Sequence, residues 1–274
     1  MPFLNAAGVD VHYVEHGAGE HTVVLLHGFP VDHRIMTGCF EPVFEKRPGW
    51  RRVYLDLPGM GQTVAPASVR RTDDVFAVVS AAVTQLVPEG RYAVCGESYG
   101  GYLARGLVAA DPGRVSGLAL VCPMVVAEHS ERDVDEHVVL VRDAFVAASP
   151  DDSDFDEVAV VQTEETYGRT RREVLSGLAI ADPAAVARIE GSYGGTFTME
   201  SGTPPYTSPV LFFLGRQDAT TGYRDAWRIL EHYPRATFAV LDRAGHNAQI
   251  EQPALFAALV HEWLDRVEES LRTP

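Results

Sequence analysis

Residues 92–101 read Tyr-Ala-Val-Cys-Gly-Glu-Ser-Tyr-Gly-Gly, an apolar run that stops at a glycine-flanked serine and then enters a helical pattern. The run Tyr92–Cys95 predicts a buried strand, and the pattern over Tyr99–Ala110 predicts a helix. In the pattern G-x-S-x-G, the two glycines allow the strand and the helix to approach closely around a sharp turn. Such a turn exposes the serine hydroxyl, which makes Ser98 a candidate nucleophile.

The same alternation of strand and helix extends through most of the chain. Short apolar runs alternate with longer helical patterns, and several runs are apolar throughout. This favours an α/β fold with a mostly parallel, twisted sheet flanked by helices. The expected strands are Val9–Val14, Thr22–Leu26, Arg52–Leu55, Tyr92–Cys95, Val115–Val121, Val210–Leu214 and Thr237–Leu241. The other expected helices are Asp73–Val87, Tyr223–His232 and Pro253–Glu269.

The alternation stops after Cys122 and resumes near Pro209. The stretch between them reads as short helices broken by proline or paired glycines. We therefore predict a core of residues 1–122 and 209–274, and an inserted helical cap at 123–208 over one end of the sheet. From Glu128 to Glu157 this insertion carries eleven acidic and two basic residues. A solvated outer face is the simplest interpretation, and an electrostatic filter against anionic substrates is the alternative.

A serine is a weak nucleophile until a base takes its proton. His246 is the candidate base, because it follows the strand Thr237–Leu241 and so lies at the carboxyl end of the sheet, as Ser98 does. A surface loop histidine is the alternative interpretation of this position. Asp218 follows the strand Val210–Leu214 at the same end and is the candidate acid that orients the base. The chain order serine, aspartate, histidine is the order used by one known hydrolase fold.

A serine nucleophile also needs N–H donors for the oxyanion. The backbone N–H of Tyr99 comes directly after the serine. The loop His27-Gly28-Phe29-Pro30 follows the first buried strand, and its Phe29 N–H is the second candidate. Gly28 permits the turn there, although a plain strand-end turn would look the same.

The composition limits the classes of partner. The 274 residues carry a net charge of −15, which argues against nucleic acid and against anionic membranes as partners. The longest apolar run is far too short to span a bilayer. Three widely spaced cysteines and a start without signal-peptide features lead us to expect a cytoplasmic protein. We expect no metal site, since His12, His16 and His21 lack ligand spacing and are interpreted as surface residues.

With these motifs in place, the sequence resembles the α/β-hydrolase superfamily, in particular its capped, cofactor-free esterase and lactonase-like members. The stretches that carry the resemblance are His27–Pro30, Asp56–Gly61, Gly96–Gly101, Gly215–Asp218 and Gly245–His246. The resemblance implies a catalytic triad of Ser98, Asp218 and His246, with Phe29 and Tyr99 as oxyanion donors. Related epoxide hydrolases and haloalkane dehalogenases use an aspartate where this chain has Ser98, which argues against those two reactions.

The function expected from these observations is hydrolysis of a small ester or lactone through an acyl-enzyme, with a small-molecule substrate and without a cofactor. C–C bond hydrolysis, amide hydrolysis and perhydrolysis on the same triad stay open, as does a non-catalytic ligand-binding or receptor protein. The sequence is silent on oligomeric state. Six further residues are candidates to line the substrate pocket, although each could instead only pack the fold. These are Asp32, His33, Met124, Tyr167, Tyr193 and Asn247.

Overall fold

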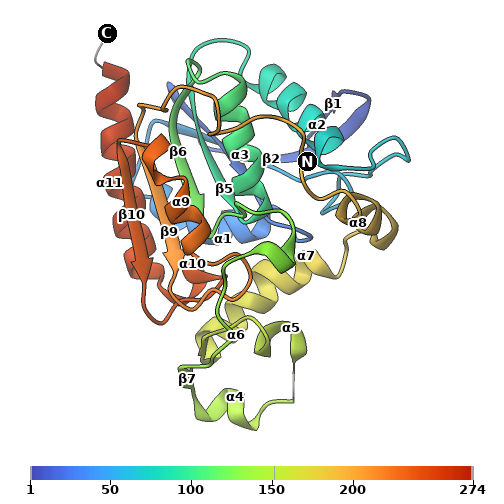
Figure 1. Ribbon diagram of the computed structural model, residues 1–274, viewed down its shortest axis with the longest axis vertical. Helices are drawn as coiled ribbons and strands as arrows, with labels where there is room; N and C mark the ends of the chain where they lie inside the picture. The colour runs from blue at the N-terminus through green and yellow to red at the C-terminus, as the bar shows by residue number, and fades with distance from the viewer. Residues whose placement is uncertain (1, 151, 273–274) are drawn as a thin grey trace.

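The computed structural model describes residues 2–150 and 152–272, and its centre is an eight-stranded sheet (Figure 1). The strand order is β1-β2-β4-β3-β5-β6-β9-β10. The first two pairings are antiparallel and the other five are parallel, so the predicted α/β fold is confirmed. The strands are β1 (Phe3–Ala6), β2 (Val9–His16), β3 (His21–Leu26), β4 (Trp50–Leu55), β5 (Tyr92–Glu97), β6 (Val115–Val121), β9 (Val210–Gly215) and β10 (Ala236–Leu241).

Helices cover both faces of this sheet, which explains why its central strands are apolar throughout. One apolar core lies under α2 (Thr72–Leu86), α3 (Tyr99–Ala110) and α9 (Arg224–Arg228). A second lies under α1 (Arg34–Phe44), α10 (Ala248–Glu251) and α11 (Pro253–Arg272). Helix α1 was not expected from the sequence, because Pro42 interrupts its helical pattern. Within the described residues, no helix is long and apolar enough to cross a membrane.

Helix α11 shows how the sequence fixes this packing. Its apolar stripe follows the helical repeat and is fully buried at Val260, Trp263 and Val267. A side chain at Gly117 in β6 would come within 2.4 Å of the Val267 side chain. The glycine therefore lets the helix lie close against the middle of the sheet.

The segment between β6 and β9, residues 123–208, is here called the inserted segment. It holds short helices, as expected, and also a two-stranded parallel pairing of β7 with β8 that was not expected. Figure 1 shows α4, α5 and α6 beyond the carboxyl ends of the sheet strands. The elements are η1 (His129–Glu131), β7 (Val141–Arg142), α4 (Ala144–Ala148), α5 (Ser153–Asp156), β8 (Val161–Gln162), α6 (Glu164–Thr170), the π-helical turn η2 (Arg171–Leu175), α7 (Ser176–Leu178) and α8 (Pro183–Glu190).

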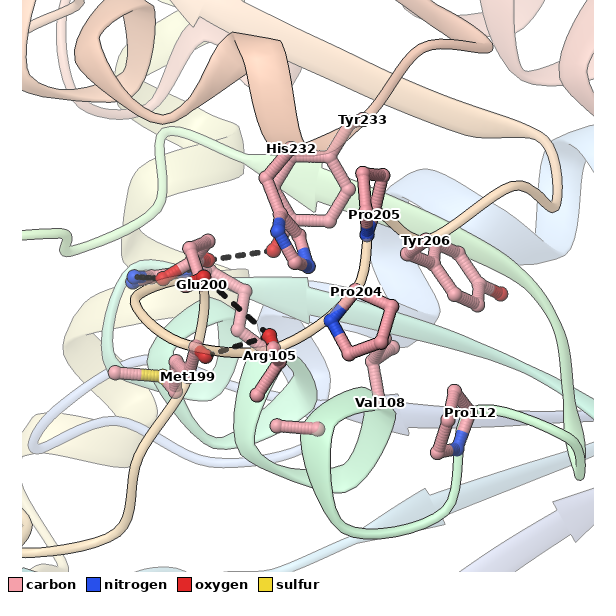
Figure 2. A pocket seen from close by; sticks show the side chains of 12 residues that line it. Arg105, Val108, Pro112, Met199, Glu200, Pro204, Pro205, Tyr206, His232 and Tyr233 are labelled. Carbon is pink, nitrogen blue, oxygen red and sulfur yellow. Dashed lines mark hydrogen bonds and ion pairs between the residues drawn. The ribbon is translucent and has the colours of Figure 1, made fainter.

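The last part of the inserted segment returns along helix α3 and is anchored by a buried ion pair. Figure 2 shows Glu200 between Arg105 of α3 and Tyr233. The two carboxylate oxygens of Glu200 accept from the Arg105 guanidinium at 2.6 and 2.8 Å, and Tyr233 donates to one of them at 2.5 Å. Burial opposes ionisation of Glu200, but the charge and hydrogen bonds of Arg105 outweigh it and lower the pKa to about 2. Arg105 also donates to the Met124 carbonyl, which ties this anchor to the carboxyl end of β6.

Candidate active site

Ser98 occupies the turn between β5 and α3 in a left-handed backbone conformation, with φ +50° and ψ −116°. The turn is tight, since a side chain at Gly96 would lie 2.3 Å from the Gly100 carbonyl oxygen. A side chain at Gly100 would lie 2.2 Å from the carbonyl oxygen of Leu26. Both glycines of the G-x-S-x-G pattern are thus required by the close approach of strand and helix, as predicted.

The structure brings the three candidate triad side chains together at the carboxyl end of the sheet. The Nε2 atom of His246 lies 3.0 Å from the Ser98 hydroxyl, and its Nδ1 atom lies 3.1 Å from a carboxylate oxygen of Asp218. These are hydrogen-bonding distances on both sides of one imidazole ring. They come from residues separated by 148 and 28 positions in the chain.

Asp218 is held by more than the imidazole. Its carboxylate accepts from the backbone N–H groups of Thr220 and Thr221 at 2.8 and 3.0 Å, and from the Thr221 hydroxyl at 2.7 Å. Burial opposes its ionisation, but the interaction with His246 and these hydrogen bonds lower the pKa of Asp218 to about 2. Asp218 is therefore a fixed anion at neutral pH. Thr221 was not recognised in the sequence, because its role depends on a turn conformation.

His246 carries the opposite shift. Burial acts to lower its pKa, yet the charge of Asp218, its hydrogen bond and the neighbouring Glu97 raise the pKa above its usual value. The arrangement thus favours the imidazolium that forms when the ring accepts a proton.

Glu97 also lies at this site, beside His246, and was not expected there from the sequence. Its carboxylate oxygen lies 3.5 Å from His246 Nε2, and its side chain is 3% exposed. Burial raises the pKa of Glu97 to about 7, against the opposing effect of His246. An acidic residue at the end of an otherwise apolar strand, directly before the serine, was the signal that could have identified it.

The candidate oxyanion loop lies against the nucleophile. A side chain at Gly28 would come 2.2 Å from a Glu97 oxygen and 3.1 Å from Ser98 Cβ. Within residues 2–150 and 152–272, the N–H groups of Phe29 and Tyr99 have no protein acceptor. Two free donors beside the hydroxyl are what an oxyanion hole requires.

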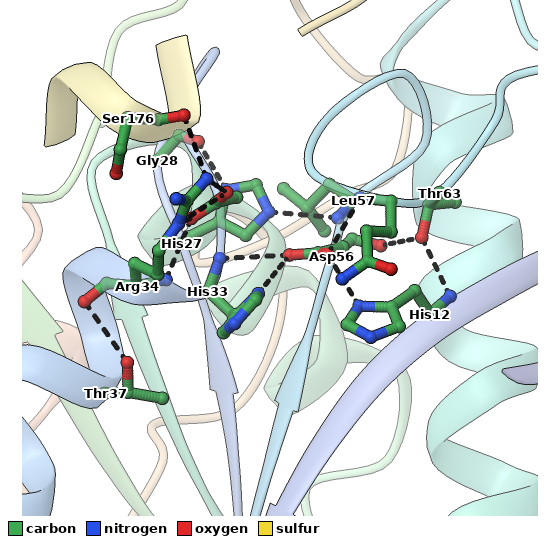
Figure 3. A network of polar contacts seen from close by, with 12 residues as sticks. His12, His27, Gly28, His33, Arg34, Thr37, Asp56, Leu57, Thr63 and Ser176 are labelled. Atoms are coloured by element: carbon green, nitrogen blue, oxygen red, sulfur yellow. Dashed lines mark hydrogen bonds and ion pairs between the residues drawn. The ribbon is translucent and has the colours of Figure 1, made fainter. Parts of the chain in front are cut away.

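A buried polar network supports this loop from behind (Figure 3). His27 donates from Nδ1 to the Gly28 carbonyl at 2.7 Å and accepts the Leu57 N–H at Nε2, at 3.0 Å. Asp56 accepts from Nδ1 of both His12 and His33, at 2.7 and 2.8 Å. The expectation that His12 is a surface residue is wrong, because it is fully buried against this carboxylate.

The site opens into a pocket of about 270 Å³. Of the six candidate lining residues, Met124, Tyr193 and Asn247 line it. The other three lie elsewhere. Asp32 is buried and paired with Arg34, His33 is bonded to Asp56, and Tyr167 packs on Phe155 inside the inserted segment. The lining also includes Phe29, Val31, Ile35, Val158, Val174, Leu175 and Leu178, with Glu97, Arg132, Asp154, Glu157 and Thr220 as polar members.

In the part of the chain that the structure describes, two groups of ligand-type side chains lie close enough to share an ion. One is His12, His33 and Asp56, and the other is Cys122, Asp218 and His246. In both groups the Nδ1 atoms of the histidines already hydrogen bond to the carboxylate. Both arrangements are accounted for by hydrogen bonding within the chain.

Comparisons with known proteins agree with this architecture. A family profile described as the α/β hydrolase fold matches residues 21–253. A 2-hydroxy-6-oxo-6-(2'-aminophenyl)hexa-2,4-dienoic acid hydrolase of Metapseudomonas resinovorans is 23% identical, over 96% of this chain and 90% of its own length. A pimeloyl-[acyl-carrier protein] methyl ester esterase of Nitrosomonas europaea is 24% identical, over 86% of this chain and 92% of its own. The crystal structure of an α/β superfamily hydrolase from Oenococcus oeni PSU-1 superposes with a TM-score of 0.89 at 26% identity, covering 98% of this chain and all of that one.

Proposed function

This chain belongs to the α/β hydrolase fold family, and from that membership we propose that it is a serine hydrolase that cleaves small esters or lactones. The observation that carries the proposal is the imidazole of His246, which lies 3.0 Å from the Ser98 hydroxyl and 3.1 Å from the Asp218 carboxylate. That geometry allows the ring to remove a proton from the hydroxyl while the carboxylate stabilises the resulting charge.

The proposed reaction has two halves. His246 takes the proton of Ser98 as the serine oxygen attacks the carbonyl carbon, and the N–H groups of Phe29 and Tyr99 hold the oxyanion. His246 then protonates the leaving alkoxide, and water attacks the acyl-enzyme with the same base. The scheme uses only side chains and backbone of this chain. In it the inserted segment acts as a cap that supplies one wall of the substrate pocket.

C–C bond hydrolysis is the second candidate, supported by the resemblance to a dienoic acid hydrolase. It would use the same serine on a ketone in place of an ester. The size of the pocket, about 270 Å³, suits a small substrate in either case.

A fluorophosphonate probe tests the proposal directly. We expect it to form a stoichiometric adduct on Ser98 of the native protein, located by peptide mass spectrometry. The labelled protein should lose hydrolysis of small p-nitrophenyl esters and lactones in proportion to labelling. Three further assays separate the alternatives. Cleavage of a vinylogous diketo acid would indicate a C–C hydrolase, cleavage of an anilide an amidase, and peracid formation from hydrogen peroxide a perhydrolase. Native protein that takes up no probe and binds ligands without turnover would instead indicate a receptor.

The proposed mechanism has a pH dependence that involves Glu97. His246 must be neutral to act as a base, so activity falls as pH drops through its pKa. The Glu97 carboxylate favours the imidazolium and raises that pKa, whereas Arg132 acts in the opposite direction and Asp218 is ionised throughout. Glu97→Gln removes one negative charge while keeping the shape. We expect the acid limb of kcat/KM to move to lower pH in this variant, measured from steady-state profiles.

The exposed residue Glu231 gives the matched control, since Glu231→Gln removes the same charge far from the imidazole. Its profile should match that of the wild type. An acid limb in Glu97→Gln that stays in place, or that moves to higher pH, would show that the Glu97 charge does not act on His246.

A further inference from the structure

Arg132 is a cation in the wall of the pocket that contains Ser98 and His246. Its guanidinium is fixed by three hydrogen bonds to backbone carbonyls. Nε donates to Val126 at 2.9 Å, one terminal nitrogen donates to Thr220 at 2.9 Å, and the other donates to Ala127 at 2.8 Å. Thr220 is two residues after Asp218, so these contacts set the position of the cation relative to the triad.

The hydrogen-bond partners of Arg132 are all neutral, although the residue lines the pocket that contains the nucleophile. Two arginines with largely buried ion pairs each have a carboxylate partner, Arg105 with Glu200 and Arg169 with Glu173. Arg132 forms an ion pair with no carboxylate of residues 2–150 and 152–272. A guanidinium has five N–H groups, and three are used here. Among the described residues, two N–H donors are left without a hydrogen-bond partner, and the charge is offset only without direct contact, by groups such as Asp218, Asp225 and Glu128.

An anion at Arg132 would use the two N–H groups that the backbone carbonyls leave unpaired. Partial burial lowers the pKa of Arg132, against the opposing effects of Tyr193, Asp218 and other acidic groups. A planar guanidinium with two free N–H groups matches the two oxygens of a carboxylate. A ligand carboxylate in the pocket would supply a negative charge in direct contact.

We propose that Arg132 binds a carboxylate of the substrate, so that the preferred substrates are small esters that also carry a free carboxylate. This proposal rests on the proposed esterase function of the same pocket. The reacting carbonyl would lie at Ser98, and the substrate carboxylate would lie at the guanidinium on the neighbouring wall. The apolar side chains between them would contact the connecting carbon chain.

The acidic residues of the pocket do not remove this preference. Asp154 and Glu157 are exposed, so water and salt screen their charges. Glu97 lies at the nucleophile, and its pKa of about 7 leaves a substantial neutral fraction near neutral pH. Arg132 is the only arginine or lysine among the described residues that line this pocket. If the acidic residues of the inserted segment instead repelled anionic substrates, the enzyme would prefer the uncharged ester. The following experiment distinguishes these two preferences.

The test compares monomethyl adipate with methyl hexanoate, two methyl esters of equal chain length that differ in the terminal carboxylate. We expect kcat/KM of the wild type to be about 10-fold or more higher for monomethyl adipate. Arg132→Gln should raise KM for monomethyl adipate by about 10- to 100-fold and change methyl hexanoate by less than about 3-fold. Arg132→Lys keeps the charge and should retain part of the preference. Arg142→Gln, at an exposed arginine of the inserted segment, is the control and should match the wild type.

Equal losses of kcat/KM on both esters in Arg132→Gln would overturn the proposal. They would show that Arg132 only holds the backbone segments together and does not bind the substrate carboxylate. A wild type that prefers methyl hexanoate would overturn it in favour of the acidic filter. Binding of the monoamide of adipic acid, measured by calorimetry on wild type and Arg132→Lys, needs no turnover. It therefore distinguishes failure of the carboxylate site, where binding is absent, from failure of the esterase proposal, where binding is present but neither ester is cleaved.

Discussion

Replacement of Ser98 by alanine is expected to lower kcat for ester hydrolysis by about 10⁶-fold. The hydroxyl lies 3.0 Å from His246 Nε2, within hydrogen-bonding distance of the proposed base. The remaining activity would come from the oxyanion donors and from substrate positioning alone. Burst and steady-state kinetics with a p-nitrophenyl ester, after active-site titration of the wild type, measure this loss.

The Ser98→Ala variant should stay folded. Position 98 has a positive φ that disfavours serine and alanine alike, so the substitution adds no backbone strain. Its thermal unfolding midpoint and its binding of a substrate analogue should therefore remain close to those of the wild type. Ser68→Ala, at an exposed serine, is the control for the substitution itself. Residual activity above about 1% in purified, folded Ser98→Ala would contradict a covalent serine mechanism.

Replacement of Asp218 by asparagine is expected to lower kcat by about 10⁴-fold with little change in KM. The Thr220 and Thr221 N–H groups require an acceptor and would orient the amide oxygen toward themselves. The amide NH₂ would then face His246 Nδ1 and make that nitrogen an acceptor. The ring proton would move to Nε2, where it blocks removal of the proton from Ser98.

In Asp218→Asn the single hydrogen of the Thr221 hydroxyl can turn to the Cys122 carbonyl, which lies 3.0 Å away, so the turn keeps a hydrogen bond. Asp242→Asn, at an exposed position, should have wild-type kinetics. Because the pKa of Asp218 is about 2, the carboxylate stays charged across the neutral range and its titration should not shape the profile there. A loss below about 10-fold would mean that His246 is oriented by another group.

Much of this molecule could be predicted from local patterns. Seven expected strands were found within two residues of their predicted ends. The signal was strongest in β5, β6 and β9, which are buried throughout and are therefore mostly apolar. The strand β1 was missed, since Phe3–Ala6 is an edge strand with only one fully buried residue. The G-x-S-x-G pattern carries its own geometric reason, and it located the turn at Ser98.

The composition of the pocket could not be predicted in the same way. Met124, Tyr193 and Asn247 line it, whereas Asp32, His33 and Tyr167 are held elsewhere by contacts with distant residues. The inserted segment lacks a strong hydrophobic period, so nothing in its sequence states which of its short helices faces the triad. Residues close in sequence to a motif residue therefore did not all line the pocket.

By itself, the sequence determined the sheet, the turn at Ser98 and the identity of Asp218 and His246 as its candidate partners. The burial of a strand and the backbone geometry of a turn constrain the residue types at a few consecutive positions. These constraints can therefore be recognised in the sequence. Only the tertiary structure decided that Glu97 lies 3.5 Å from the imidazole and that Arg132, in the wall of the pocket, donates to backbone carbonyls. Those properties depend on which side chains from distant segments pack together in the interior, where the dielectric constant is low. The Arg132–Thr220 contact, for example, joins residues 88 positions apart in the chain.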